Sequence, residues 1–534
     1  MALTKVTYSM IKGEVVNALD YGATGDGVTD DTAGYLAAIA TGKNVYFPEG
    51  TYIVAPVTAG SDRTSAAVLA EGQCLMGDGA NSVIKWKAGV TAQTAVMVKN
   101  ASNIVISDLK FVDCALAFQI TPDTDDSVKN VIIQNCYFED LGIGLGLGDQ
   151  LATNNNSKSC AKITVQNCVF NTIGVHGIVL SNVNGFIVDN CYFENIGYFV
   201  GSGGDCVDMS QGSRYGTVSN CIGTDSRYFC KVESFTPAGG VAAKCLSHNI
   251  SILNNNIYAM TPQGALESEF AIAVLNGVSD VIISNNTIEY PNTAIFCSDT
   301  NPAADGPLFI TSNVVTSADW GILLFMDNAG INIPVNITDN TINASNTGVR
   351  IIHTSVSVKD NFITSDTCVE VRFDSDGLSF VGNHMLGTSH GIFFNTSTTL
   401  TDNVEISSNK ISSTTNFIYL PGPHKQLSVT SNHFRGQTGG GYINNADSVM
   451  VTGNYIQDNS VSGFPGLNIT NVTNALVSAN MCNTNPANAG VSLGLSGTLT
   501  NVLVIDNVSS NTVSVGAGTN VVNTNNAFVI GYTA

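Results

Sequence analysis

The chain has 534 residues and a formal net charge of −21; only 12% of its residues are charged, and 52 are glycine. This composition excludes a helical bundle and favours turn-rich β-structure. The acidity excludes nucleic acid as a partner, because few cationic side chains are available to neutralise phosphates. No run reaches the roughly eighteen apolar residues of a membrane helix, so we also expect no membrane insertion.

The first forty residues are predicted to end in a short helix. Residues 1–16 are too short to form a domain, and the glycine-rich and aspartate-rich residues 17–32 interrupt any regular strand. Thr29 or Asp30 is placed to accept hydrogen bonds from the first turn of a helix that ends near residue 40. The apolar stripe of this helix is predicted at Ala33, Leu36, Ile39 and Ala40. A short helix ahead of several hundred residues with strand patterns predicts a cap on one end of a β-structure.

A nine-residue pattern recurs about every 20–30 residues, from NIVISDLKF at 103–111 to SVMVTGNYI at 448–456. Its second, fourth and ninth positions are apolar. Coiling each repeat over the previous one pairs every strand with its own equivalent, which gives a right-handed, single-stranded parallel β-helix. We therefore predict an all-β solenoid with its N-terminal cap over residues 17–483. Residues 484–534 are predicted to form a β-rich tail that caps the solenoid or joins copies of the chain.

The seventh position of the repeat is cysteine in four early copies and asparagine in later ones. Equivalent residues in adjacent repeats lie about 4.8 Å apart with parallel Cβ vectors, which is poor geometry for a disulfide. We therefore predict a buried ladder of small side chains, with asparagine amides hydrogen-bonded along the axis, rather than disulfides or a metal site. Its members are Cys136, Cys168, Cys191, Cys221, Asn255, Asn286, Asn340, Asn361, Asn383, Asn409, Asn432, Asn454, Asn480 and Asn507.

Outward-facing charges concentrate in two consecutive repeats, GGDCVDMSQGSRYG (203–216) and DSRYFCKVESF (225–235). A strand spacing of ~4.8 Å and a two-residue rise of ~6.7 Å place the Cβ atoms of Asp208 and Glu233 about 8 Å apart. Inverting glycosidases separate their two carboxyl groups by roughly 6.5–9.5 Å. Lys231 lies beside both and is suited to keep one carboxylate ionised or to bind an acidic sugar. Side chains predicted to contact a sugar are Arg214, Tyr215, Arg227 and Tyr228.

Two further groups compete with this pair. Glu267 and Glu269 are two residues apart, so an extended chain places them on one side. Asp205 is predicted to stack close to His176, in VHGIVL (175–180). The second group faintly resembles the Asp and His-Gly motifs of polygalacturonases, but the order and spacing differ and no residue role is carried over. A histidine at a strand start is more often a structural hydrogen-bonding residue.

The N-terminal residues TKVTYSMIKGEVVNALDYGATGDGVTDDT (4–32) and VYFPEGTY (45–52) closely resemble the start of the β-helical domain in bacteriophage tailspikes of the pectate-lyase-like superfamily. The resemblance implies a homotrimer in the virion tail. It implies attachment to the phage tail or another spike through residues 1–16. It also implies cleavage or deacetylation of a bacterial capsular polysaccharide or O-antigen. We expect no cofactor.

Three hypotheses for the activity follow. Glycoside hydrolysis would use Asp208 and Glu233 as acid and base, with Asp205 and Glu269 as further catalytic candidates and His176 and Glu267 as further substrate-binding candidates. A lyase acting on a uronate would instead take its base from Lys231, Tyr228 or His176. A fibre that only binds would hold glycan without shortening it. An esterase, with a Ser/Asp/His set assembled across rungs, is less favoured than these three.

Overall fold

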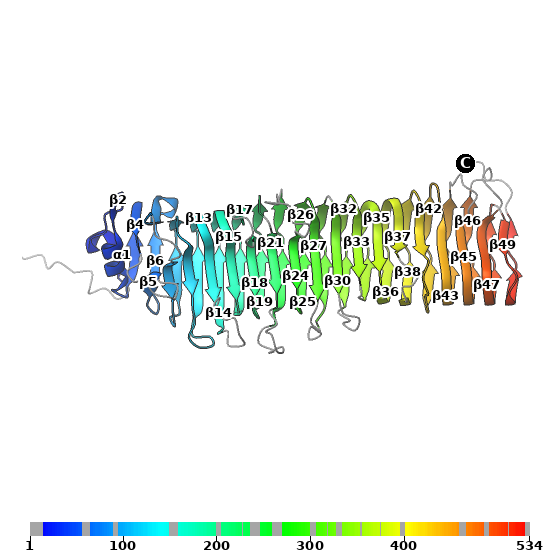
Figure 1. Ribbon diagram of the computed structural model, residues 1–534, viewed down its shortest axis with the longest axis horizontal. Helices are drawn as coiled ribbons and strands as arrows, with labels where there is room; N and C mark the ends of the chain where they lie inside the picture. The colour runs from blue at the N-terminus through cyan, green and yellow to red at the C-terminus, as the bar shows by residue number, and fades with distance from the viewer. Residues whose placement is uncertain are drawn as a thin grey trace, which may run out of the picture. The chain divides into compact units, whose positions relative to one another are not determined.

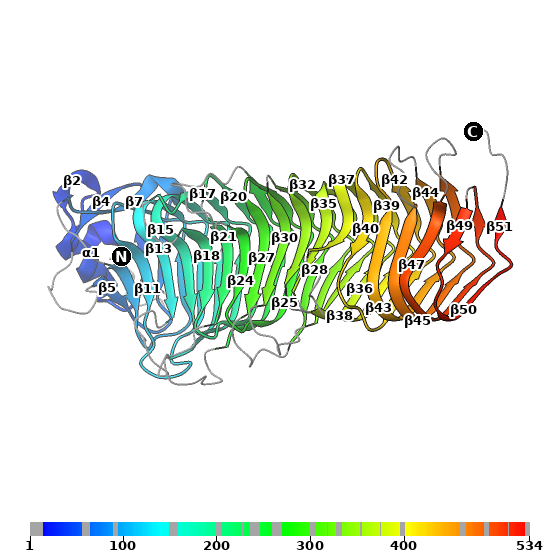
Figure 2. The same ribbon diagram turned by 45° about the vertical axis from the view of Figure 1, so that its right-hand side comes forward.

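The computed structural model describes residues 14–55, 65–88, 94–148, 158–198, 204–226, 228–234, 246–258, 270–299, 306–317, 319–326, 334–352, 355–373, 375–395, 401–458, 466–484, 491–510 and 512–528. The chain divides into two compact units, with the boundary after Val281. Each unit is built from short parallel strands that pair with their equivalents one rung away (Figures 1 and 2). Within the described residues, no helix has the length and apolar character needed to cross a membrane.

Unit 1 is a parallel β-helix with three sheets, and the chain passes from the first to the second to the third in each rung. The first sheet contains β1 (Val15–Asn17), β3 (Asn44–Phe47), β6 (Cys74–Gly77), β9 (Ile104–Ser107), β12 (Lys129–Gln134), β14 (Cys160–Gln166), β16 (Val183–Asp189), β19 (Arg214–Ser219) and β22 (His248–Leu253). The second contains β2 (Asp26–Asp30), β4 (Gly50–Val54), β7 (Ser82–Trp86), β10 (Lys110–Val112), the first parts of β13 (Tyr137–Gly148) and β15 (Val169–Ser181), β17 (Tyr192–Ile196), β20 (Ile222–Thr224) and β23 (Asn256–Tyr258). The third contains β5 (Ser65–Leu69), β8 (Thr94–Val98), β11 (Leu116–Ile120), the second parts of β13 and β15, β18 (Asp205–Ser210), β21 (Tyr228–Glu233) and β24 (Phe270–Leu275). This third sheet carries the candidate site.

Unit 2 has the same three-sheet organisation, and β25 (Ser279–Ser284) includes the unit boundary. Its first sheet contains β28 (Leu308–Thr311), β31 (Val335–Thr338), β34 (Val356–Lys359), β36 (Ser375–Val381), β38 (Thr401–Ser407), β41 (Leu427–Thr430), the second parts of β43 (Gly441–Thr452), β45 (Leu467–Ser478) and β47 (Val491–Ile505), and β50 (Thr519–Thr524). The second contains β26 (Thr287–Tyr290), β29 (Val314–Ser317), β32 (Thr341–Ala344), the first parts of β35 (Phe362–Arg372) and β37 (His384–Phe394), β39 (Lys410–Ser413), β42 (His433–Gly436), β44 (Tyr455–Asp458), β46 (Met481–Thr484), β48 (Val508–Ser509) and β51 (Ala527–Phe528). The third contains β27 (Thr293–Asp299), β30 (Trp320–Met326), β33 (Thr347–Ile352), the second parts of β35 and β37, β40 (Asn416–Leu420), the first parts of β43, β45 and β47, and β49 (Thr512–Val515).

The predicted ladder is confirmed. The four cysteines are free and buried, and the Cys221 N–H donates to Asn255 Oδ1 at 2.9 Å. In unit 2 each asparagine donates to the next, as Asn340 does through both its N–H and Nδ2 to Asn361 Oδ1 at 2.9 Å. The structure adds Asn313 and Asn526 to the ladder. Because each amide satisfies the hydrogen-bonding groups of the next, a column of buried polar side chains is stable at this corner.

The capping helix is present as α1 (Thr32–Ile39), preceded by a short 3₁₀ turn η2 (Ala18–Tyr21); a second, η3 (Gly79–Asn81), follows β6. Asp30 accepts from the Thr32 N–H at 3.1 Å, as predicted, but the N-cap residue of α1 is Asp31, whose side chain makes no capping hydrogen bond. The predicted apolar stripe is correct only at Ile39, because Ala33 and Ala40 are exposed and Leu36 is half-buried. The other buried residues of the helix are Gly34, Tyr35 and Ala38. A Cβ at Gly34 would lie 2.2 Å from the backbone nitrogen of Ala23, so close packing on the residues directly after η2 selects this face.

Candidate active site

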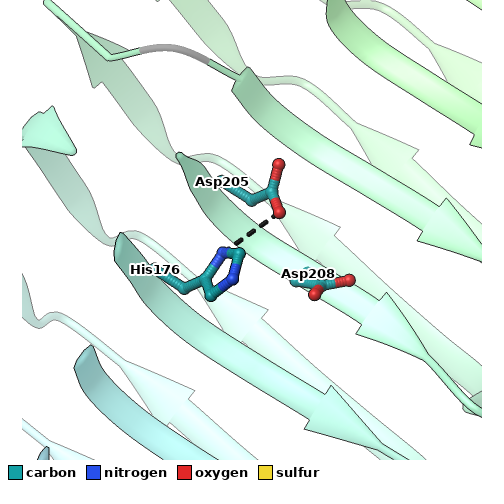
Figure 3. Close-up of side chains that lie close together, drawn as sticks. All are labelled: His176, Asp205 and Asp208. Carbon is teal, nitrogen blue, oxygen red and sulfur yellow. Dashed lines mark ion pairs between the residues drawn. The ribbon is translucent and has the colours of Figure 1, made fainter. Parts of the chain in front are cut away.

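The candidate site lies on the outer face of the third sheet of unit 1, where three consecutive strands each contribute side chains. His176 comes from β15, and Asp205 and Asp208 come from β18 (Figure 3). Lys231 and Glu233 come from β21. The strands pair in parallel register, with Asp208 directly opposite Lys231. The same register places His176 one rung from Asp205. These five residues form the carboxylate cluster.

A break in strand alternation brings Asp205 and Asp208 to one face although they are three residues apart. Cys206 and Val207 between them are both fully buried, whereas a regular strand would send one of the two outward. The next rung repeats this arrangement, because Phe229 and Cys230 are both buried ahead of Lys231. In both of these rungs, two outward-facing residues therefore flank a pair of buried apolar residues.

Lys231 is the centre of the carboxylate cluster. Its Nζ lies 3.4 Å from Asp205 Oδ2, 3.7 Å from Asp208 Oδ2 and 3.3 Å from Glu233 Oε2. The oxygens of Asp208 and Glu233 are therefore no more than 7.0 Å apart, the sum of 3.7 and 3.3 Å. The Asp205 side chain is 1% exposed and that of Glu233 is 28% exposed, so the cluster runs from a buried end to one that water reaches.

The two aspartates of the cluster have opposite pKa shifts. Burial raises the pKa of Asp208 to about 6, although Lys231 acts in the other direction. Burial also acts to raise the pKa of Asp205, but the charge of Lys231 and the contact with His176 outweigh it and lower the pKa. The three carboxylates raise the pKa of Lys231 above its ordinary value despite burial, so this side chain stays charged. Near neutral pH the cluster thus combines an ionised carboxylate with one that readily carries a proton.

Several buried polar atoms of the carboxylate cluster are not hydrogen-bonded to any described residue. They are His176 Nδ1, both carboxylate oxygens of Asp205, and Asp208 Oδ1. His176 Nδ1 lies 3.1 Å from Asp205 Oδ2, but the two are not aligned for a hydrogen bond. Unsatisfied buried groups of this kind are costly, and they concentrate where a ligand or water binds.

One metal-ligating combination is present among the described residues. His176, Asp205 and Asp208 each offer one ligand atom, and these atoms lie within 4.8 Å of one another. The ammonium of Lys231 is already close to both carboxylates. It supplies the positive charge that a cation would otherwise bring, so the donor set fits a metal ion poorly.

The remaining predicted site residues are distributed differently. Arg214 donates to Asn182 Oδ1 and the Gly212 carbonyl, and it lines a separate pocket of about 380 Å³. Tyr215, 59% exposed, packs edge-on against His248. Tyr228 lies directly opposite Asp205 in the strand register, which places it beside the carboxylate cluster.

The pocket beside Arg214 was not predicted. It is lined by Asp125, Asp126, Ser159, Asn182, Arg214, Leu246 and His248. These residues precede or begin strands of the first sheet in successive rungs, and that shared position in the repeat is the signal that could have identified them. Arg227, Glu267 and Glu269 lie outside the described residues.

Two family models match parts of the chain. The model of rhamnogalacturonase A/epimerase, pectate lyase-like, matches residues 15–226, and the model of the right-handed β-helix region matches residues 151–336. The handedness predicted from the repeat is thus confirmed, and the chain is a right-handed parallel β-helix protein. The resemblance to pectate-lyase-like tailspikes is also confirmed.

This chain matches only part of the length of each curated relative. Mannuronan C5-epimerase AlgE1 of Azotobacter vinelandii is 31% identical over 205 residues, which is 34% of this chain and 14% of the relative. The preneck appendage protein of Bacillus phage PZA is 25% identical over 227 residues, which is 33% of this chain and 24% of the relative. Among solved structures, a tailspike protein of E. coli bacteriophage HK620 has a TM-score of 0.47 at 12% identity, covering 79% of this chain and 76% of that one.

Proposed function

We propose that this chain is a virion-tail protein that binds and depolymerises a bacterial surface polysaccharide, either a capsule or an O-antigen. The similarity to a phage appendage protein supports the location. The pectate-lyase-like match over residues 15–226 supports a polysaccharide as substrate, and these residues include His176, Asp205 and Asp208. The net charge of −21 also suits a glycan ligand better than a polyanion bound through phosphates.

Glycoside hydrolysis is the reaction that the carboxylate cluster supports best. The single observation that carries it is that three carboxylates meet at one lysine, where the pKa of Asp208 is raised to about 6 and that of Asp205 is lowered. Environments that separate the pKa values of neighbouring carboxyl groups are how glycosidases assign an acid and a base.

In this mechanism protonated Asp208 gives its proton to the glycosidic oxygen as the bond to the anomeric carbon breaks. Glu233, the more exposed carboxylate, takes a proton from the water that attacks the anomeric carbon. Lys231 keeps Asp205 ionised and lies 3.3 Å from Glu233, and Asp205 holds Lys231 and His176 in place. The bound of 7.0 Å between the two carboxylate oxygens admits both an inverting pair, at roughly 6.5–9.5 Å, and a retaining pair, at ~5–5.5 Å, so the configuration of the released sugar decides between them.

Mass spectrometry of digests of purified capsules and O-antigens from a panel of strains tests this assignment. Hydrolysis yields oligosaccharides that carry one added water per cut, and Asp208→Asn should yield none. Fragments with unsaturated ends and no added water would contradict hydrolysis, as would a polymer that is bound but never shortened.

A second candidate is proton abstraction from a uronate, which leads to β-elimination or epimerisation. The similarity to mannuronan C5-epimerases favours it. Lys231 would neutralise the uronate carboxylate, and Tyr228 or His176 would supply the base. In D₂O this chemistry would place deuterium at C5 or create unsaturated ends, whereas hydrolysis does neither.

A further inference from the structure

Unit 2 contains a second group of charged side chains on the outer face of its third sheet. Arg350 on β33 lies directly opposite Glu370 on β35, and Arg372 is two residues further along β35. The Nε of Arg350 donates to Glu370 Oε2 at 2.6 Å, and the Nε of Arg372 donates to Glu370 Oε1 at 2.8 Å. Asn395 also donates to Oε1 through its Nδ2. One carboxylate thus holds two guanidinium groups in fixed positions. We call Arg350, Glu370 and Arg372 the arginine clamp.

The arginine clamp is rigid at one end and open at the other. The Glu370 side chain is 6% exposed and that of Arg350 is 11% exposed. The Arg350 guanidinium lies over the Trp320 ring, 4.5 Å from its centroid. Arg372, in contrast, is 37% exposed, so the clamp meets solvent on its side. Such an arrangement is pre-organised, because little side-chain freedom remains to be lost when a ligand binds.

The arginine clamp carries an excess positive charge. Two arginines share a single carboxylate, in a chain where acidic residues outnumber basic ones by 42 to 21 and only six residues are arginine. Burial acts to raise the pKa of Glu370, but the two arginines outweigh it and lower the pKa, so Glu370 stays ionised and the clamp keeps a net charge of +1. A buried ionic network is weak evidence for stability alone, since apolar side chains of similar volume often stabilise as well.

The terminal amino groups of the clamp remain to bind an anion. Glu370 takes up only the Nε of each guanidinium, and within the described residues neither arginine donates from an Nη nitrogen. Arginine Nη groups bind carboxylates in paired, directional hydrogen bonds. Beside the clamp, Phe393 lies directly opposite Glu370 and stacks on Tyr419 at 5.3 Å, and both rings are partly exposed. Partly exposed aromatic rings commonly pack against sugars.

We propose that the arginine clamp is a binding site for an acidic sugar, with its carboxylate at Arg350 and Arg372 and its ring near Phe393. This inference rests on the proposed function, from which it takes a glycan as the ligand. It adds that the glycan contains a uronate-type residue and that unit 2 binds it outside the carboxylate cluster.

Titration calorimetry with the full chain tests the proposal. The probes are oligomers of mannuronate, guluronate, galacturonate and glucuronate, each paired with its carboxyl-reduced neutral counterpart. The protein carries Asp208→Asn, so that no cleavage occurs during titration. Arg372→Gln should weaken binding of the best acidic oligomer at least tenfold and leave the neutral counterpart unaffected. Arg435→Gln is the matched control, because it removes an exposed arginine of unit 2 and should leave affinity unchanged.

Thermal unfolding of Arg372→Gln, expected to match the parent, separates lost binding from lost structure. Equal affinity of parent and Arg372→Gln would overturn the proposal, as would failure of all four acidic oligomers to bind. Inorganic phosphate that binds as tightly as the oligomer would also overturn it, because the clamp would then recognise an anion without a sugar. The proposed hydrolysis is judged separately, by digestion with the chain that retains Asp208. Arginine-dependent binding without cleavage would therefore support the clamp and reject the hydrolase.

Discussion

Asp208 is buried, faces outward and lies next to Lys231, and its Oδ1 accepts no hydrogen bond from the described residues; unlike Asp205, it has a raised pKa. Asp208→Asn keeps the shape of the side chain but removes the transferable proton. We expect kcat for polysaccharide cleavage to fall about 10²- to 10⁴-fold, the usual contribution of a general acid. Asp339→Asn, the same change at an exposed position with a φ of 57° that asparagine adopts readily, serves as the control. Full activity of Asp208→Asn would reject the assignment.

The pH dependence of activity should follow the same residue. Asp208 must be protonated to act as the acid, and its pKa is about 6. kcat/KM for cleavage should therefore decline about tenfold per pH unit above that value. A profile that stays flat from pH 6 to 8 would show that another group supplies the proton.

The pH dependence of stability should have a defined sign. The pKa of Asp208 rises from 3.8 to about 6 on folding, so the folded chain binds this proton more tightly than the unfolded chain. The resulting stabilisation is complete below about pH 4 and is lost as pH rises through 6, by roughly 2–3 kcal/mol. Melting temperatures of the parent should fall relative to Asp208→Asn across this window. A constant difference between the two would contradict the shift.

At the scale of elements, α1 depends on a residue without a side chain. Gly34→Ala would ordinarily favour a helix by about 1 kcal/mol. Here the new methyl group would meet the Ala23 backbone, so we expect a loss of roughly 1–3 kcal/mol in the free energy of unfolding. Ala37→Ser, on the exposed side of α1, should change it by less than about 0.5 kcal/mol. Denaturant titration measures both, and a stabilised Gly34→Ala would show that α1 packs differently.

Alanine substitutions in the asparagine part of the ladder should lower the free energy of unfolding more than those in the cysteine part. Asn409 donates to Asn432 and the Phe380 carbonyl and accepts two hydrogen bonds from Asn383. Asn409→Ala leaves these buried groups without partners and should cost roughly 3–5 kcal/mol. Cys191→Ala removes a weakly polar thiol and should cost about 1–2 kcal/mol. Equal losses in denaturant titrations would mean that the amides contribute no more than volume.

At the scale of the whole molecule, we expect three copies of the chain to assemble. Sedimentation should then give three times 55.8 kDa. Deletion of residues 484–534, the predicted capping or trimerising tail, should reduce this to one chain. Deletion of residues 1–16 should leave both the assembly and cleavage intact and abolish attachment to the virion. A parent chain that sediments as a monomer would contradict the trimer.

The sequence by itself determined the features that repeat. The β-helix and the ladder follow from short patterns, because each rung pairs with its own equivalent and the same residue types recur at the same corner. The proximity of Asp208, Lys231 and Glu233 followed for the same reason, since rung spacing and strand rise are constant.

Only the tertiary structure decided what depends on burial and long-range packing. It placed Asp205 in contact with Lys231, because alternation breaks at Cys206 and Val207. It separated the pKa values of Asp205 and Asp208, since desolvation depends on everything packed around a group. The buried face of α1 and the contact of Arg350 with Trp320 likewise join residues whose proximity no local pattern encodes.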